Sequence, residues 1–186
     1  MKFRSQALLL CLAASVAFAT DYVEFSVAER IRFSVPGSWP VRASKSTAEK
    51  TTFGFQIPNR ADKKTSDSSN LVIVSSYLSN AQEREDFEKK ASTIENSATE
   101  QKLEGWRCST LTGMQKSTQY VVWDCYRIVA DCGVKVRIAW PHLAKNPSDY
   151  DKQMEAVLFD FLTSVAPSKP VDPTSKGVLR RNEESH

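Results

Sequence analysis

The sequence predicts an α+β domain in which an antiparallel β-sheet of about six to eight strands is flanked by helices. Short segments within residues 22–57 and 106–140 alternate apolar and polar residues, a period that is typical of half-buried strands. Residues 80–103 instead repeat their apolar positions every three or four residues, as an amphipathic helix does. A broader helical stripe follows residue 146, so we expect a long C-terminal helix packed on the sheet.

The first 19 residues, MKFRSQALLLCLAASVAFA, have the three parts of a secretory signal peptide. Lys2 and Arg4 form a basic start, residues 7–16 are a short apolar run, and residues 17–19 are a small-x-small cleavage site. We therefore expect cleavage after Ala19 and a periplasmic or secreted protein.

Charge and length limit what the cleaved chain does. It has 23 Lys and Arg against 22 Asp and Glu, and this near-neutral balance argues against nucleic acid as a partner. No stretch beyond the signal peptide is long and apolar enough to cross a membrane, so no membrane anchor is expected. We assign residues 20–167 to a single domain. The proline-rich residues 168–186 are expected to be a disordered tail.

Five strands are expected before the first helix. The segment LVIVSSYL is the most apolar of them and is therefore expected near the centre of the sheet. The polar stretch Asn59–Asn70 precedes it and is expected to be a mobile loop. The five strands are Tyr22–Val27, Arg30–Val35, Trp39–Ala43, Thr51–Ile57 and Leu71–Leu78.

Two helices and three further strands follow. The first helix is expected over Asn80–Leu103, where Asn80 and Glu83 resemble a capping box and one narrow apolar stripe includes Phe87. The last helix opens at Asn146 as its cap, with Pro147 in its first turn. The three strands between the helices are Trp106–Thr112, Gln119–Ala130 and Val134–Trp140.

The last two strands are expected to form a hairpin. We take Asp131-Cys132-Gly133 as a three-residue turn in which Gly133 supplies the left-handed position. Ala130 then lies opposite Val134, and Tyr126 opposite Ile138. In this register the apolar residues form one face, which we assign to the core, and the other face carries Trp and Arg side chains.

Three cysteines remain after signal cleavage, which in an oxidising compartment predicts one disulfide and one free thiol. If residues 115–118 form a four-residue loop, Cys108 lies directly opposite Cys125, at the Cα spacing that a disulfide needs. Cys132 then stays free at the turn. The alternative bridge, Cys125 to Cys132, would require a different hairpin and remains open.

The second face of the hairpin is the candidate partner-binding site. One interpretation is that a helix covers it, with arginine stems packed along tryptophan rings. The other is a recognition surface, because Trp and Arg are enriched in binding hot spots. The candidate residues are Trp106, Trp123, Arg127, Lys135 and Arg137.

No catalytic, cofactor-binding or metal-binding residue is expected. The chain has two histidines, His142 and His186, and no HExxH, paired CxxC, GxSxG or glycine-rich phosphate motif. Asp131 beside Cys132 disfavours a thiolate. A working pair of carboxylates remains open, because Asp and Glu occur throughout the chain. We nevertheless expect a protein that is not an enzyme.

Two short stretches carry a resemblance to a known superfamily. Phe33–Trp39 reads FSVPGSW and Phe159–Pro167 reads FDFLTSVAP. Together with the order of elements, they resemble the PsbP/Mog1-like superfamily over about Tyr22 to Pro167. The resemblance implies an antiparallel sheet sandwiched by helices, a non-catalytic role and no shared active site. The secretory signal departs from the cytoplasmic members, so their roles are not carried over.

The leading functional hypothesis is an exported, non-catalytic protein of the bacterial envelope that binds another protein. Its most concrete form is an immunity-type inhibitor of a secreted toxin. The alternatives are an envelope accessory or assembly factor of the PsbP type and a small secreted hydrolase that uses carboxylates. A toxin gene beside this one would favour the first.

Overall fold

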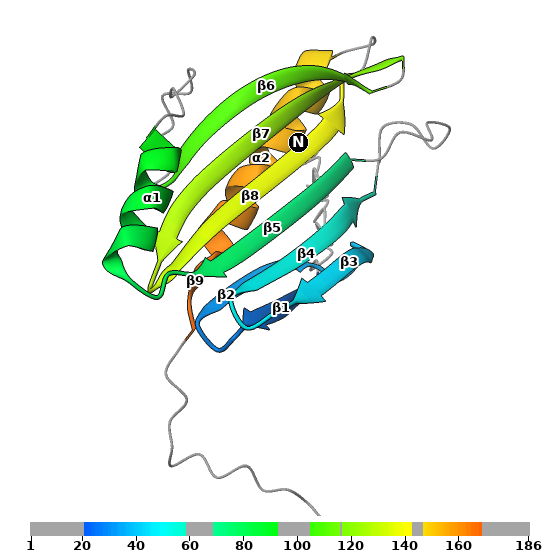
Figure 1. The fold of residues 1–186 in the computed structure, drawn as a ribbon. Coiled ribbons are helices and arrows are strands. Elements are labelled where there is room, and N and C mark those ends of the chain that lie inside the picture. Colours follow the sequence, from blue (N-terminus) through cyan, green and yellow to red (C-terminus); the bar gives the residue numbers. More distant parts are fainter. Residues whose placement is uncertain (1–20, 59–68, 93–104, 116, 143–146, 169–186) are drawn as a thin grey trace, which may run out of the picture.

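Within the residues that the structure describes, the chain folds into two antiparallel sheets and two helices (Figure 1). The structure is a computed structural model and describes residues 21–58, 69–92, 105–115, 117–142 and 147–168. The predicted signal peptide (1–19), nearly all of the polar loop and the tail, and the second half of the first helix lie outside the described residues. The predicted α+β class is confirmed, with the strands divided between two sheets.

The larger sheet has six strands, with edges at β3 and β6 and with β5 and β8 at its centre. The predicted central position of the apolar LVIVSSYL segment is confirmed, because β5 contains it. The strand that we predicted at residues 39–43 begins two residues later in the structure, at Val41. In spatial order the strands are β3 (Val41–Ser46), β4 (Lys50–Ile57), β5 (Ser69–Tyr77), β8 (Cys132–Pro141), β7 (Thr118–Val129) and β6 (Arg107–Gln115).

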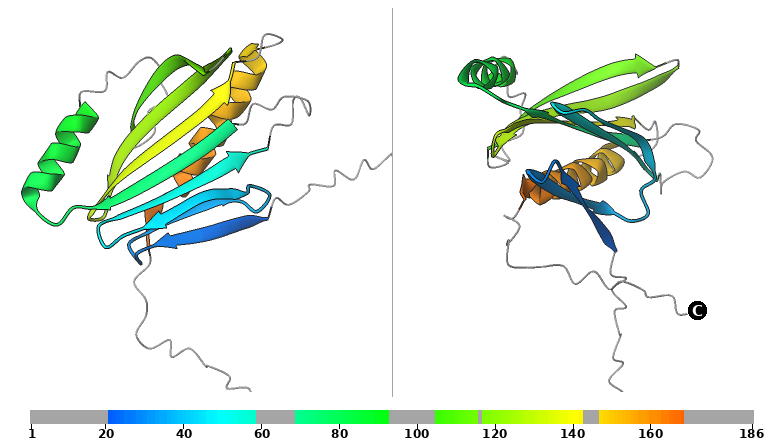
Figure 2. Two further views of the ribbon diagram at one scale, coloured as in Figure 1. Left: turned by 45° about the vertical axis from the view of Figure 1, so that its right-hand side comes forward. Right: turned by 60° about the horizontal axis from the view of Figure 1, so that its bottom comes forward.

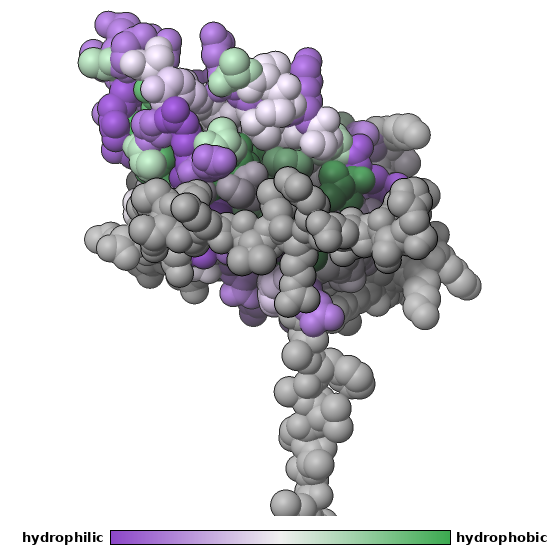
Figure 3. Space-filling view, turned by 90° about the horizontal axis from the view of Figure 1, so that it is seen from below, coloured by the Kyte–Doolittle hydropathy of each residue, from purple (hydrophilic) through white to green (hydrophobic). Residues whose placement is uncertain are grey.

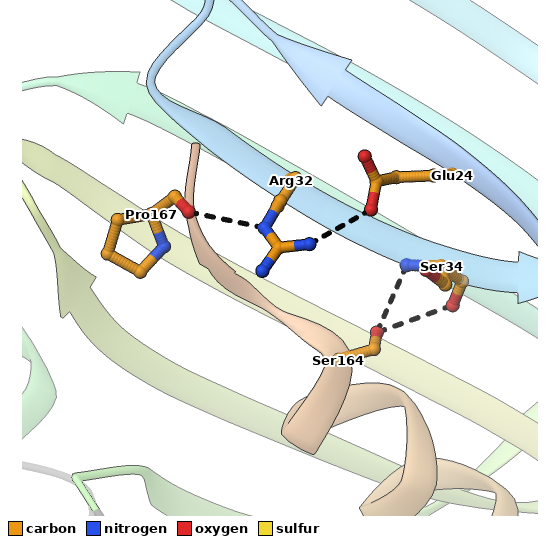
Figure 4. A network of polar contacts seen from close by, with 5 residues as sticks. All are labelled: Glu24, Arg32, Ser34, Ser164 and Pro167. Carbon is orange, nitrogen blue, oxygen red and sulfur yellow. Dashed lines mark hydrogen bonds and ion pairs between the residues drawn. The ribbon is translucent and has the colours of Figure 1, made fainter. Parts of the chain in front are cut away.

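The smaller sheet comprises β1 (Tyr22–Val27), β2 (Ile31–Pro36) and β9 (Ala166–Pro167). It joins the start of the domain to the end of helix α2 (Pro147–Ser164) (Figure 4). The backbone N–H of Ser34 donates a hydrogen bond to Ser164 Oγ at 3.1 Å, and Arg32 Nε lies 3.4 Å from the carbonyl oxygen of Pro167. These contacts fix the last turn of α2 against β2.

Two views show the layers around the larger sheet. Helix α2 and the smaller sheet cover one face, and helix α1 (Ala81–Ser92) lies on the opposite side (Figure 2). We call the face toward α2 the inner face and the other the outer face. Among the described residues, α1 is the element that lies over the outer face, and it covers one end (Figure 1).

The core fills the space between the inner face, α2 and the smaller sheet. In β2, Ile31, Phe33 and Val35 are all buried, as a strand with alternating residues requires. The ring of Phe33 lies 5.6 Å from that of Phe161 on α2 and 6.1 Å from that of Phe55 on β4. Burying each such side chain contributes about 1.5–3 kcal/mol, so this apolar contact holds the two sheets together.

Helix α1 is attached much more lightly. Its sequence is largely charged, and Figure 3 shows it as a mainly hydrophilic projection at the upper left. The predicted cap is present, since the Glu83 N–H donates to Asn80 Oδ1 at 2.9 Å. On the sheet side, Ala91 is buried and the ring of Phe87 lies 6.1 Å from that of Tyr126. The Phe87 ring therefore makes much of the contact that holds α1 on the sheet.

The predicted register of the β7–β8 hairpin is wrong by three residues, since Tyr126 pairs with Lys135 and not with Ile138. Val129 pairs with Cys132 across a two-residue turn of Ala130 and Asp131, and Ala130 has a φ of 54°. Because an alanine takes the left-handed position, the turn had no glycine to mark it. Gly133 lies in β8, where a Cβ atom would come within 2.6 Å of the Phe87 ring. Its role is close approach to α1.

The shift exchanges the two faces of β7, because side chains alternate along a strand. Trp123, Cys125 and Val129 of β7 are buried on the inner face, opposite apolar residues of β8. Tyr126, which we expected on the core face, is on the outer face opposite Lys135. The predicted apolar face of β7 is therefore wrong. The faces of the candidate site residues have to be assigned from the observed register.

Candidate functional site

The five predicted partner-binding residues do not share one face. Trp123 is 3% exposed and its ring meets that of Phe159 on α2 at 6.0 Å. Trp106 packs against the core, and the Arg127 guanidinium carbon lies 5.9 Å from its ring. Trp123 is therefore covered by α2, as one of the two interpretations expected of the tryptophans. Lys135 and Arg137 lie on the outer face.

The disulfide joins the two strands beside this group. Cys108 pairs with Cys125 in the register of β6 and β7, and their sulfurs are bonded. Cys132 is free and buried, at the other end of the hairpin. The predicted bridge is therefore the one in the structure. The wrong register of the β7–β8 hairpin did not affect this prediction, because the alignment of β6 with β7 depended only on the loop at residues 115–118.

Two rows of paired residues cross the outer face, and their charged members lie on β6, β7 and β8. Directly paired residues of neighbouring strands share a face, so the pairings define the rows. The first row, in strand order from β4 to β6, is Thr52, Val74, Lys135, Tyr126 and Arg107. The second row is Gly54, Val72, Arg137, Asp124 and Ser109.

Asp124 is a buried carboxylate on this otherwise open face. It is 6% exposed, and its oxygens accept hydrogen bonds from Arg137 Nε at 2.8 Å and Nη2 at 2.5 Å. Lys135 Nζ lies 3.5 Å from Oδ1. Burial alone would raise the pKa of Asp124, but the Arg137 hydrogen bonds and the Lys135 charge outweigh it and lower the pKa below its ordinary value. The carboxylate therefore stays ionised and holds both cations in place.

The outer face is basic. Alternation along the described strands places one acidic side chain on it, Asp124, and that carboxylate is already paired. Arg137 remains half exposed at 50% of its side chain, so it still presents charge to solvent. The cations on this face include Arg42, Lys45, Arg107, Lys135 and Arg137.

A cavity of about 280 Å³ opens between α1 and the β6–β7 end of the sheet. Its lining combines apolar and basic side chains: Phe87, Ala91, Tyr126, Ile128, Arg107 and Arg127. Gly105 lies at the same cavity with a φ of 78°, and a Cβ there would be 3.1 Å from Arg127 Nε. The missing side chain leaves the Arg127 guanidinium its space.

A second polar cluster ties two turns together. Arg30, the last residue of the β1–β2 turn, forms an ion pair with Asp131 in the β7–β8 turn. Its guanidinium also lies 4.0 Å from the Tyr77 ring centre. Burial raises the pKa of the adjacent Cys132 thiol, and the Asp131 carboxylate adds to that shift. This environment disfavours a thiolate nucleophile, so the cluster is suited to holding the turns together.

Carboxylates on α2 serve the packing of that helix. Asp151 accepts a hydrogen bond from the buried Trp140 indole at 2.6 Å and lies 3.2 Å from His142 Nδ1. Burial raises the pKa of Glu155, one turn further on, and the Asp151 charge raises it further. Asp151 therefore anchors the start of α2 to the end of β8. Among the described residues, no group of three or more His, Cys, Asp or Glu side chains could hold a metal ion.

Sequence reasoning missed Asp124 and Tyr126 as site residues. The available signal was an aspartate in the middle of the apolar run YVVWDCY, where an unpaired charge would be costly, together with Lys135 and Arg137 two residues apart on the next strand. A two-residue turn at Ala130-Asp131, in place of the expected three-residue turn, would have placed all three on one face.

Comparison with known proteins finds similarity of fold. No family model matches the sequence, and no curated protein is similar to it in sequence. A Bacteroides thetaiotaomicron protein of known structure is 15% identical with a TM-score of 0.51. The match covers 75% of this chain and 46% of that one, so this chain spans less than half of its length. No described helix has the length and apolar character needed to cross a membrane.

Two structures of Mog1 are also similar. A point mutant of protein Mog1 is 10% identical over 81% of this chain and 97% of that one, with a TM-score of 0.47. The Saccharomyces cerevisiae Ran-binding protein Mog1p is 12% identical over 79% and 95%, with a TM-score of 0.40. Both similarities are of fold alone.

Proposed function

We propose that this protein works by binding another protein, with the outer face of the larger sheet as the docking surface for an acidic partner. The observation that carries the proposal is the pair of cations, Lys135 and Arg137, that the buried Asp124 holds on an open sheet face. A cation fixed in place loses less side-chain entropy when it meets an anion than a free one does.

Charge complementarity supports an acidic partner. The strand residues of the outer face carry several cations, and Asp124, their one described acid, is already neutralised by its neighbours. Such a surface attracts negative potential and repels basic proteins, which gives both steering and selectivity. The inner face is covered by α2 and the smaller sheet and forms the hydrophobic core, so it is not available as a docking surface.

The finer proposal concerns where and against what the protein acts. We place it in the bacterial envelope, on the basis of the predicted signal peptide at residues 1–19 and the Cys108–Cys125 disulfide, which is typical of an oxidising compartment. There we propose a non-catalytic inhibitor of immunity type, whose acidic partner is a secreted toxin. An N-terminus at Thr20 in the exported protein, measured by intact mass, would support the location. Retention of residues 1–19 would contradict it.

The binding test compares the same substitution on opposite faces. The partner is captured from envelope extract with the parent protein, purified, and titrated by calorimetry against Lys135→Gln and Lys152→Gln. Lys135→Gln removes a central outer-face charge while Arg137 still holds Asp124, so we expect affinity to fall at least fivefold. Lys152 is exposed on α2, and its variant should bind like the parent.

Two results would contradict the proposal. One is equal affinity for Lys135→Gln and the parent, combined with an affinity that does not weaken as salt rises from 50 to about 300 mM, because exposed charge pairs are screened. The other is turnover of peptidoglycan, peptide or ester substrates by the pure protein, which would point back to a carboxylate-dependent hydrolase.

A further inference from the structure

The cavity beneath α1 combines features that a ligand would use and that the fold does not need. Arg107 and Arg127 both line it, and neither forms an ion pair with any described carboxylate. The one acid at its rim, Glu88, is 3.5 Å from Arg84 on the same helix. Arg107 belongs to the outer-face row beside Tyr126, and it brings a charge without a described counter-ion to this opening.

The remaining lining is apolar and partly aromatic. Phe87 and Ala91 of α1 form one wall, and Tyr126 and Ile128 of β7 form another. Ligand pockets for drug-sized molecules measure about 300–1,000 Å³. At about 280 Å³ this cavity is just below that range, so it suits one or two side chains better than a large free ligand.

The cavity is continuous with the basic outer face. Tyr126 lies between Arg107 and Lys135 in one cross-strand row, and Lys135 Nζ is 5.1 Å from the Tyr126 ring centre. Neighbouring strands are about 4.8 Å apart, so Arg107 and Lys135 are roughly 10 Å from each other across the sheet. An extended chain covers that distance in about three residues.

We propose that this cavity binds an acidic segment of the partner protein that carries one apolar anchor residue. The anchor side chain enters between Phe87 and Ile128, an adjacent carboxylate meets Arg107, and a second carboxylate about three residues away reaches Lys135. This inference rests on the proposed function, since it names the part of the acidic partner that the docking surface receives.

The test uses a defined peptide instead of the partner. The probe is acetylated and amidated Glu-Phe-Ser-Glu, and its matched control is Gln-Phe-Ser-Gln. Binding to the full chain is followed by NMR at the Tyr126 and Ile128 resonances. We expect the Glu peptide to shift these resonances in a saturable manner and the Gln peptide to bind at least fivefold more weakly, because charge-assisted hydrogen bonds to arginine are lost.

Three variants separate charge from shape. Arg107→Gln should weaken the Glu peptide at least fivefold and leave the Gln peptide unchanged. Ala91→Leu keeps the helix propensity of α1 and adds three carbons to the cavity wall, so it should weaken both peptides. Lys152→Gln removes a positive charge from the exposed side of α2, away from the cavity, and should bind both peptides like the parent.

The outcomes distinguish this inference from the proposed function. Equal binding of the Glu and Gln peptides, or no saturable shift at millimolar concentration, overturns the acidic-segment site while leaving partner binding by the outer face in place. Tighter binding of free phenylpropionate than of the Glu peptide overturns it in favour of a small carboxylate ligand. If the peptide binds as expected but partner affinity is the same for Lys135→Gln and the parent and does not weaken as salt rises, the outer-face proposal fails instead.

Discussion

Asp124 on β7 and Arg137 on β8 lie directly opposite each other and form a two-point hydrogen-bonded pair on the outer face of the sheet. Both carboxylate oxygens accept from the guanidinium, at 2.8 and 2.5 Å, and the carboxylate itself is almost fully buried. Hydrogen bonding to Asp124 also raises the pKa of Arg137. The geometry of the pair therefore depends on the charge of both groups. Its contribution to the free energy of unfolding can be measured by changing the pH.

Asp124→Asn should destabilise the fold by about 2 kcal/mol at pH 7, because charge-assisted hydrogen bonds are lost and Lys135 and Arg137 repel each other. The folded pKa of Asp124 is below its unfolded value. Its stabilisation is thus fully present above the unfolded pKa, near 3.9, and is lost as pH falls through the folded pKa. Urea unfolding at pH 7, 5 and 3 should show the variant and the parent converging at the lowest pH.

The control for this prediction is Asp160→Asn, an exposed carboxylate on α2. Its effect on the free energy of unfolding should stay within about 0.5 kcal/mol at each pH. A constant difference between Asp124→Asn and the parent from pH 7 to pH 3 would show that the loss is one of shape and not of charge.

Much of the fold follows from sequence pattern because hydrophobic periodicity fixes which elements form. The alternation in residues 31–35 predicts β2, and Ile31, Phe33 and Val35 are all buried. The broad stripe after Asn146 predicts α2, whose Leu158 and Leu162 are fully buried. The Cys108–Cys125 alignment also followed from pattern, because it needed only a loop length between two adjacent strands.

The candidate site could not be predicted in the same way, because it depends on one turn. A register shift of three residues, like any odd shift, leaves both strands in place yet exchanges the faces of one of them. Gly133 was the natural choice for a left-handed turn residue, and Ala130 takes that conformation instead. The reason for Gly133 is contact with Phe87, which comes from a different part of the chain. Tertiary contact of this kind leaves no local signal.

Trp123→Ala should destabilise the protein by about 3–5 kcal/mol, since a buried ring against Phe159 is replaced by a cavity. Trp123→Phe keeps most of the packing and should cost clearly less. Thermal melts of the two variants measure the difference. If Trp123→Ala melts like the parent, the tryptophan is not part of the core and the placement of α2 over β7 is wrong.

Peptide mapping without reduction should recover Cys108 joined to Cys125 and Cys132 as a free thiol. The bridge closes a loop with a sequence separation of 17, so replacing both partners by Ser should cost about 3 kcal/mol. Native Cys132 should react slowly with iodoacetamide at pH 7.5 and rapidly in 6 M guanidinium, because burial and Asp131 raise its thiol pKa. Rapid native alkylation, or Cys132 within the bridge, would contradict the hairpin register.

Gly133→Ala should loosen α1 while leaving the core folded. The new Cβ would lie 2.6 Å from the Phe87 ring, which real contacts do not permit, so the ring must leave the sheet. Because Phe87 forms much of the anchorage of α1, amide exchange across residues 81–92 should accelerate at least tenfold, while β5 and β8 stay protected.

The matched variant for this prediction is Gly113→Ala, because a Cβ at Gly113 meets nothing within 4 Å. It makes the same substitution in another strand of the same sheet and should leave exchange in α1 unchanged. Combining Gly133→Ala with Phe87→Ala removes the clash, so the double variant should lose little more protection in α1 than Phe87→Ala alone. Uniform acceleration across β5, β8 and α1 in Gly133→Ala would mean that α1 is part of the core's cooperative unit. In that case the cavity beneath it could not open independently of global unfolding.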